Sequence, residues 1–281
     1  MKLPELLFGT AGIPHSAGER TALKGIERIA ELGLGCMELE FVRGVRVNEK
    51  SAIEIKQLAR EKGVHLSAHA PYFINFNARE IEKITASRKR LLHSIRIASL
   101  CGARSVVFHA AFYMGDSPQK TYSAVKNQME EIIDQAEFAA GEERLIIRPE
   151  TTGKISQFGT IEELVNLSSE VKGIAPCVDF AHCHARTNGK TNSYQDFCNI
   201  LACIENELGK TALDDMHIHI AGIAYGNRGE IKHLNLKESD LNYPVLLRAL
   251  KDFRVSGLVI CESPNLEDDA LLLQEIYRSF G

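Results

Sequence analysis

Eight short apolar runs recur along this chain, and stretches of helical period separate them from end to end. The predicted strands are Glu5–Thr10, Cys36–Leu39, Val64–Ala68, Ser105–His109, Leu145–Pro149, Ala175–Asp179, Met216–Ile220 and Gly257–Cys261. The predicted helices are Glu19–Leu32, Glu49–Lys62, Ile81–Leu100, Gln119–Ala140, Ile161–Glu170, Tyr194–Leu208, Asp240–Asp252 and Asp268–Phe280. Because alternating strands and helices produce parallel sheets, eight such units predict a closed (β/α)8 barrel, or TIM barrel.

The length of the chain agrees with one barrel. Its 281 residues are close to the usual size of about 250 residues for this fold. No linker or low-complexity segment divides the chain, so we expect residues 1–281 to form a single domain. The competing architecture is a doubly wound open sheet. That fold favours a glycine-rich phosphate loop after an early strand, and Gly9-Thr10-Ala11-Gly12 matches such a loop poorly.

Composition is typical of a globular protein of the cell interior. Hydrophobic residues make up 44% and charged residues 25% of the chain. No uncharged apolar run approaches the roughly 18 residues that span a membrane. The start, Met1-Lys2-Leu3-Pro4-Glu5, lacks the pattern of a signal peptide, so we expect a cytoplasmic location. A net charge of −4 disfavours a general nucleic-acid coat but allows basic loops.

The seven cysteines include no CxxC pair. In a cytosolic chain of this size we expect them to be reduced and mostly buried. Cys177 and Cys183 flank the polar residues discussed below, but we expect neither to bind a metal.

Histidines and acids follow most of the predicted strands. His69 and His109 come at the ends of the third and fourth strands. Glu150 and Glu262 directly follow the fifth and eighth strands, where an unpaired buried carboxylate is costly. Because the carboxyl ends of barrel strands meet at one mouth, this pattern predicts a metal site there. Neutral imidazole suits Zn²⁺, Mn²⁺ or Fe²⁺.

The sixth and seventh strands add further candidates. Asp179 and His182 are three residues apart at a strand end and can face one pocket. His217 and His219 share one face of a strand, and only one of them needs to be a metal ligand. The residues alone leave open which of the two it is. A following polar loop holds Glu230 and His233, whose spacing is weaker support for metal binding.

This set of donors is larger than one ion needs, since zinc usually takes four ligands. Two or three ions that share carboxylates such as Glu150 use the set more fully. Closely spaced metal ions are suited to phosphoester cleavage.

At these residues the chain resembles the endonuclease IV family of apurinic/apyrimidinic (AP) endonucleases, within the xylose-isomerase-like barrels. The similar segments are His69–Phe76, Phe108-His109, Glu150–Gly153, Asp179–His182, Met216-His217 and Glu262–Pro264. The resemblance implies a trinuclear zinc site and cleavage of the phosphodiester 5′ of abasic sites in DNA. His69, His109 and bridging Glu150 would bind one zinc, and Asp179, His217 and Glu262 a second.

The resemblance assigns the third zinc to His182 and an Asp-x-His pair. Here this chain departs from the family, because the loop reads Glu230-Ile231-Lys232-His233, with Glu for Asp and one extra residue. The resemblance also implies that Tyr72 contacts distorted DNA. We add Phe73, Arg43, Arg46 and His219 as substrate-binding candidates, and we take Glu150 as the catalytic residue.

Basic residues gather on the loops expected at the catalytic end, where they would hold phosphates. They are Arg43, Arg46, Arg79, Lys154, Arg186, Lys190, Arg228 and Lys232.

Three hypotheses follow. The first is an AP endonuclease with two or three Zn²⁺ ions, or Mn²⁺, which acts on abasic DNA as a monomer. The second is a sugar isomerase or epimerase that holds one Mn²⁺ or Mg²⁺. That reading leaves His69, His109, His182 and His233 without a role, which favours the first. The third is a non-catalytic barrel that binds a phosphorylated ligand or nucleic acid.

Overall fold

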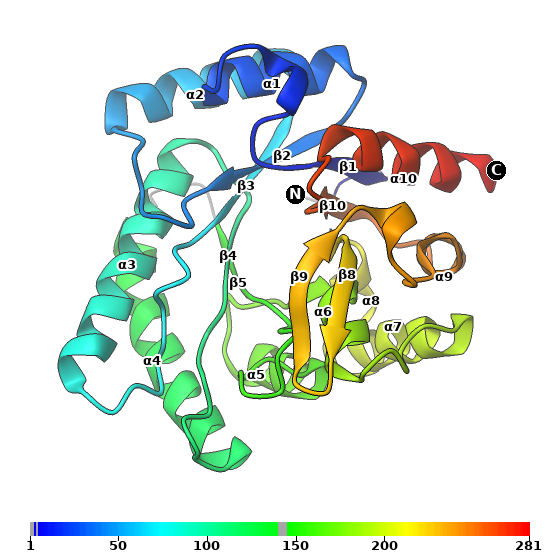
Figure 1. Ribbon diagram of the computed structural model, residues 1–281. Helices are drawn as coiled ribbons and strands as arrows, with labels where there is room; N and C mark the ends of the chain where they lie inside the picture. The colour runs from blue at the N-terminus through cyan, green and yellow to red at the C-terminus, as the bar shows by residue number, and fades with distance from the viewer. Residues whose placement is uncertain (1–2, 4, 140–144) are drawn as a thin grey trace.

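The fold is a parallel barrel with helices on its outside (Figure 1). The computed structural model describes residue 3, residues 5–139 and residues 145–281. The barrel strands are β1 (Leu6–Ala11), β2 (Cys36–Glu40), β3 (His65–His69), β4 (Ser105–Phe108), β5 (Ile146–Pro149), β6 (Cys177–Asp179), β7 (Met216–Ile220) and β10 (Gly257–Cys261). Each of the eight lies within two residues of its predicted bounds, which confirms the predicted (β/α)8 barrel.

Helices fill the connections between the strands. They are α1 (Ala22–Glu31), α2 (Glu49–Lys62), α3 (Ile81–Leu100), α4 (Pro118–Ala139), α5 (Ile161–Glu170), α6 (Phe180–Arg186), α7 (Tyr194–Leu208), α8 (Lys210–Leu213), α9 (Tyr243–Asp252) and α10 (Glu267–Ser279). Short 3-10 helices, η1 (His15–Ala17) and η2 (Leu236–Glu238), lie in two loops. The predicted end of the fourth helix, Ala140, is outside the described residues.

Local sequence explains where several helices begin and end. The Asn48 side chain accepts a hydrogen bond from the Ser51 amide and so caps α2, which ends at Gly63 in the left-handed conformation. Thr160 and Glu163 form a capping box at the start of α5. The prediction placed the start of α1 three residues early, because Thr21, and no earlier residue, caps that helix.

The order of strands in the sheet is β5-β4-β3-β2-β1-β10-β7-β6, and all paired neighbours are parallel. The two end strands, β5 and β6, meet through isolated parallel bridges, Ile147 with Ile174 and Glu150 with Cys177. This short seam closes the barrel. Large apolar side chains between barrel and helices, such as Ile26, Leu91 and Phe197, are fully buried.

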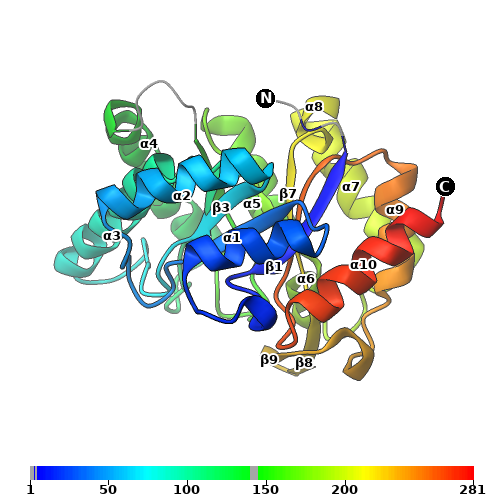
Figure 2. The same ribbon diagram turned by 90° about the horizontal axis from the view of Figure 1, so that it is seen from above.

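Two of the features that were not predicted from the sequence bear on the site. The helix α6 follows β6 without a loop, since Asp179 is both the last residue of the strand and the N-cap of the helix. The segment predicted as a polar loop is an antiparallel hairpin, β8 (Gly222–Gly226) and β9 (Gly229–Leu234). Figure 2 shows this hairpin at one end of the barrel and α8 at the other. The hairpin therefore stands at the mouth formed by the carboxyl ends of the strands.

Candidate metal centre

The mouth of the barrel holds a cavity of about 300 Å³. Because the barrel strands are parallel, the residues at their carboxyl ends converge there. The residues that line the cavity are His69, Tyr72, His109, Phe112, Glu150, Lys154, Gln157, His182, Glu230, His233 and Glu262. Most of the predicted metal ligands are among them, and only Asp179 and His217 are not.

Glu150 lies at the centre of the site. Its Oε2 atom is 3.1 Å from His69 Nε2 and 2.9 Å from His109 Nε2. Its Oε1 atom is 3.2 Å from His182 Nδ1 and 3.3 Å from His219 Nδ1. Burial alone would raise the pKa of Glu150, but the imidazoles, His109 and His219 foremost, hold it well below its ordinary value. Glu150 is therefore a carboxylate within reach of several donors, as a bridging ligand requires.

The first group of donors is His69, His109 and Glu150, whose ligand atoms lie within 4.8 Å of one another. The Nδ1 atom of His69 is 2.7 Å from the Ala70 carbonyl oxygen, which can only accept, so Nδ1 carries a proton. In the neutral ring, Nε2 then presents a lone pair to the Glu150 carboxylate. Two lone pairs 3.1 Å apart repel each other unless a proton or a metal ion lies between them.

The second group is Glu150, Asp179, His219 and Glu262, again with ligand atoms within 4.8 Å. Asp179 is fully buried, and its Oδ2 atom makes no hydrogen bond to any described residue. Burial, together with the nearby charges of Glu262 and Glu150, raises the pKa of Asp179 to about 6 despite the opposing effect of His182. The nearest nitrogen to Oδ2 is His182 Nδ1, at 3.3 Å. A buried carboxylate oxygen without a hydrogen bond, among other acids, is the environment that a divalent cation would stabilise.

The third group combines Asp179, His182 and His233, with ligand atoms within 4.8 Å. His182 Nδ1 is 2.9 Å from the Thr151 carbonyl oxygen, which leaves its Nε2 lone pair for the cavity. That Nε2 atom is 3.4 Å from His233 Nε2 and 3.5 Å from a carboxylate oxygen of Glu230. The donors of this group thus face one point between α6 and the hairpin.

A β-bulge explains how Glu230 and His233 both reach the cavity. In a regular strand, residues three apart point to opposite faces. In β9, however, Glu230 pairs with Tyr225 and Lys232 pairs with Ala224, so that Ile231 is an extra residue. The bulge restores the phase of the strand and turns both side chains to the same face. The spacing that departs from the endonuclease IV pattern therefore still brings these two residues together.

The structure separates His217 from His219. His219 lies beside Glu150 and Glu262, at 3.3 Å from each, and it is fully buried. His217 lies one layer deeper in the barrel, where its Nδ1 atom is 3.0 Å from Ser105 Oγ and its Nε2 atom is 3.1 Å from Glu38 Oε2. His217 was the predicted metal ligand and His219 a predicted substrate-binding residue. This arrangement favours the reverse at the mouth, with His219 as the metal ligand there.

The predicted substrate-binding residues lie around the mouth. Tyr72 is 56% exposed, and its ring centre is 5.5 Å from that of His69. Phe73, beside it, is 70% exposed but does not line the cavity. Arg43 and Arg46 line a second cavity, of about 480 Å³, which also contains Glu38 and Glu40.

Several of the basic loop residues have structural partners. Arg186 donates hydrogen bonds to the carbonyl oxygens of Thr152 and Lys154, and Arg79 donates one to the Met114 carbonyl oxygen. Lys154 lines the metal cavity itself. Of the predicted basic patch, Lys154, Arg43 and Arg46 therefore border the two cavities.

Glu38 is the residue of this region that sequence reasoning missed. It is fully buried in β2, and its carboxylate oxygens lie 3.1 Å from both His217 and His219. The available signal was an acid in the middle of an apolar run, Cys36-Met37-Glu38-Leu39. Such a residue is costly in a barrel interior unless a cation or a donor faces it.

The chain thus combines a parallel (β/α)8 barrel with imidazoles and carboxylates that converge at its mouth. The model of one family, described as xylose isomerase-like TIM barrel, matches residues 26–279. The chain belongs to this family. In the described residues, no helix has the length and apolar character that a membrane crossing needs.

Two relatives are similar to most of the chain. It is 46% identical over 273 residues to an uncharacterized protein of Methanocaldococcus jannaschii, and the match covers 97% of both chains. It is 22% identical over 203 residues to a probable endonuclease 4 of Mycoplasma pneumoniae, and that match covers 70% of this chain and 67% of the other.

Two solved structures share the fold. Endonuclease IV from Thermus thermophilus has a TM-score of 0.70 and 21% identity, with 99% of this chain and 98% of the other covered. A D-tagatose 3-epimerase-like protein has a TM-score of 0.72 and 18% identity, with 96% of each chain covered. The fold thus occurs in both kinds of protein that the sequence hypotheses contrast.

Proposed function

We propose that this chain is a metal-dependent AP endonuclease, which hydrolyses the phosphodiester 5′ of abasic sites in DNA during base-excision repair. The observation that carries the proposal is that three groups of donors adjoin one another at one cavity, joined through Glu150 and Asp179. A single-ion enzyme does not need the histidines of the first and third groups. The similarity to the probable endonuclease 4 of Mycoplasma pneumoniae supports the same reading.

The donor set fits two or three Zn²⁺ ions, with Mn²⁺ as the alternative. The first ion would use His69, His109 and Glu150, and the second Glu150, Asp179, His219 and Glu262. The third would use His182, Glu230 and His233. When bound, closely spaced divalent ions supply hydroxide at neutral pH and neutralise charge on a phosphodiester.

Other residues of the mouth would handle the DNA. Tyr72 and Phe73 are exposed aromatic side chains at the rim, suited to stack against a base or fill the gap of a missing one. Lys154 inside the cavity and Arg43 and Arg46 in the neighbouring one would contact phosphates. We expect the protein to act on abasic duplexes as a monomer in the cytoplasm.

One observation favours a second candidate, a sugar epimerase or isomerase. Glu150, Asp179, His219 and Glu262 form a complete set of three carboxylates and one imidazole, which is enough for one Mn²⁺ or Mg²⁺. In that enzyme the carboxylates would also move a proton on the sugar.

The decisive experiment is incision of a duplex that carries a single tetrahydrofuran site. We expect zinc-loaded wild-type protein to cut 5′ of the site and Glu150→Gln to be inactive, because the variant lacks the shared negative charge. Circular dichroism should show the same fold in both. Glu275→Gln, an exposed acid on α10, is the matched control and should cut as the wild type does.

An intact duplex after incubation with the zinc-loaded wild type would refute the nuclease. Manganese-dependent interconversion of ketohexoses by the same preparation would then support the epimerase, and inactivity in both assays would support a non-catalytic barrel. The metal content of the mouth separates the two enzymes independently, since the nuclease needs two or three ions there and the epimerase one.

A further inference from the structure

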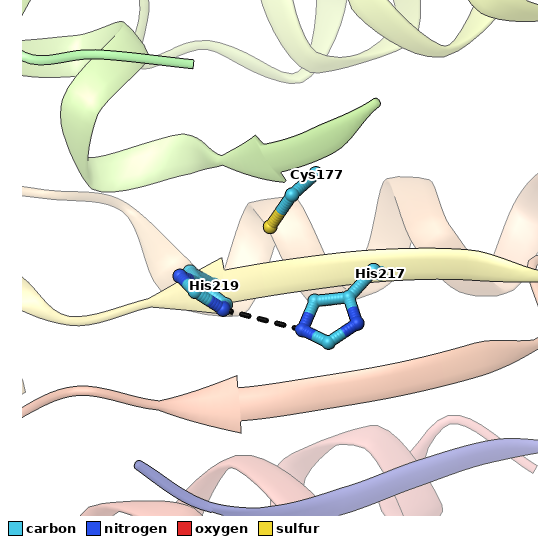
Figure 3. Close-up of side chains that lie close together, drawn as sticks. All are labelled: Cys177, His217 and His219. Atoms are coloured by element: carbon cyan, nitrogen blue, oxygen red, sulfur yellow. Dashed lines mark hydrogen bonds between the residues drawn. The ribbon is translucent and has the colours of Figure 1, made fainter. Parts of the chain in front are cut away.

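A second cluster of metal-binding side chains lies below the mouth, inside the barrel. Cys177 comes from β6, His217 and His219 from β7, and Glu38 from β2. All four are buried, with no more than 1% of any residue exposed. Figure 3 shows the Cys177 thiol pointing toward the two imidazoles. Cys177 pairs with His217 across the strands, so both belong to the layer beneath Asp179 and His219.

The distances among His217, His219 and Glu38 match those between ligands of one ion. His217 Nε2 is 3.2 Å from His219 Nε2, and each of these atoms is 3.1 Å from an oxygen of Glu38. In a tetrahedral zinc site with Zn–N bonds of about 2.0–2.1 Å, neighbouring ligand atoms are about 3.3 Å apart. The ligand atoms of Cys177, His217 and His219 all lie within 4.8 Å of one another.

An unpaired oxygen supports the same conclusion. Glu38 Oε1 is fully buried and makes no hydrogen bond within the described part of the chain, although Oε2 accepts one from Ser67 Oγ at 2.7 Å. The nearest ring nitrogen to Oε1 is His219 Nε2, at 3.1 Å, so both atoms face the same point of the cluster. On the far side of His217, the Ser105 hydroxyl is placed to accept the Nδ1 proton, which leaves the Nε2 lone pair for a metal.

Charge balance also favours a divalent cation. Metal binding deprotonates a thiol, so the bound Cys177 thiolate and the Glu38 carboxylate would together carry two negative charges, which one divalent ion neutralises. Arg148, a buried cation on β5, hydrogen-bonds the backbone of Asp215 and lies 3.4 Å from its carboxylate, so its charge has another partner. A thiolate and two imidazoles select zinc rather than an ion that prefers oxygen.

We propose that the barrel interior contains a zinc site formed by Cys177, His217, Glu38 and the Nε2 atom of His219. His219 would then bind an ion through each ring nitrogen as an imidazolate, having released its N–H proton to solvent, because its Nδ1 atom faces Glu150 and Glu262 at the mouth. The site is closed, with four protein ligands and no position for substrate, so its role is structural. It explains why two histidines occupy one strand face when the mouth uses only one.

Elemental analysis of the purified protein tests the inner site. Cys177→Ser should contain about one zinc ion fewer per chain than the wild type, because the thiolate is a ligand. Cys101→Ser, a change of another fully buried free cysteine, is the matched control and should keep the wild-type content. Equal zinc in Cys177→Ser and the wild type would overturn the proposal.

A spectroscopic measurement on the unaltered protein covers the case in which Cys177→Ser does not fold. Protein produced in zinc-depleted, cobalt-supplemented medium should show a thiolate-to-cobalt charge-transfer band in the near ultraviolet. Absence of that band would overturn the proposal of a zinc site inside the barrel. Glu150→Gln should keep the band while losing incision, so the outcome is independent of the nuclease proposal.

Discussion

Single carbonyl groups fix which atoms of the histidines face the metal cavity. The Ala70 carbonyl oxygen accepts from His69 Nδ1, and the Thr151 carbonyl oxygen accepts from His182 Nδ1. Each contact sets the tautomer of its ring and turns the Nε2 lone pair inward. The backbone beside β3 and β5 therefore prepares the imidazoles for a cation before any ion arrives.

Tyr72 is the side chain for which we predict an effect on DNA rather than on metal. Tyr72→Ala should weaken binding of a duplex with a non-cleavable linkage at the abasic site by about 1–3 kcal/mol, since one stacking contact is lost. Fluorescence anisotropy measures the affinity, and elemental analysis should show unchanged zinc. Ile53→Ala, which changes an exposed apolar residue on α2, is the control. An unchanged affinity would remove Tyr72 from the DNA site.

Among the elements, the hairpin β8–β9 has the most unusual construction. Deleting Ile231 should leave the third metal position intact, because Glu230 and His233 would then be two residues apart in a regular strand and still share a face. His233→Ala should lose about one ion, as it removes a ligand. Elemental analysis of the zinc content of the deletion variant and of His233→Ala tests this expectation. A deletion variant that loses as much metal as His233→Ala would contradict the bulge interpretation.

The loop after β1 is tied to α10 by Glu267, whose carboxylate accepts hydrogen bonds from the backbone amides of His15 and Ser16 at 2.9 and 2.8 Å. Glu267→Gln should lower the free energy of unfolding at neutral pH by about 1–2 kcal/mol, because one charged acceptor is lost. Chemical denaturation measures this difference, with Glu275→Gln as an exposed control.

The effect of Glu267 should depend on pH. Burial would raise the pKa of Glu267, but the bonds from the Ser16 and His15 amides lower it below the ordinary value of 4.5. Its contribution is therefore complete above the unfolded pKa and disappears as the pH falls through the lower, folded pKa. The wild type and Glu267→Gln should converge in stability in that acidic range. A constant difference across the range would show that the carboxylate charge is not responsible.

The barrel as a whole closes at its weakest strand contact. The strands β5 and β6 meet through isolated bridges and through the Thr151 hydroxyl, which hydrogen-bonds the backbone of Asp179. Glu150 and Asp179 stand on the two sides of this seam. Ions at the mouth would bind both sides and hold the seam closed.

Removing the metal should accordingly destabilise the protein. A ligand at 100 times its dissociation constant stabilises a fold by about 2.7 kcal/mol, so chelation should lower Tm by several degrees. Removal of the metal should accelerate amide hydrogen exchange more in residues 146–150 and 177–179 than in β1 and β2. An equal acceleration of hydrogen exchange along the whole chain would contradict a role of the metal at the seam.

The sequence predicted the barrel well, because each buried strand is an apolar run such as Gly257–Cys261 whose identity does not depend on distant contacts. It did not distinguish His217 from His219, since both lie on one face and only depth in the barrel separates them. Glu38 was missed because its partners are remote in sequence. The hairpin was missed because its strands are short and contain glycine, and their pairing with each other defines them.

Glu150 belongs to two of the donor groups, and it touches histidines from β3, α6 and β7 as well as His109. An ion that settles on one side of this carboxylate reorients it for the neighbouring position and removes the repulsion that an empty pocket of acids would retain. Occupancy of the mouth should therefore rise cooperatively, in one steep transition as free zinc increases. Partly filled molecules would be rare, and the protein would change between fully loaded and empty over a narrow range of zinc supply.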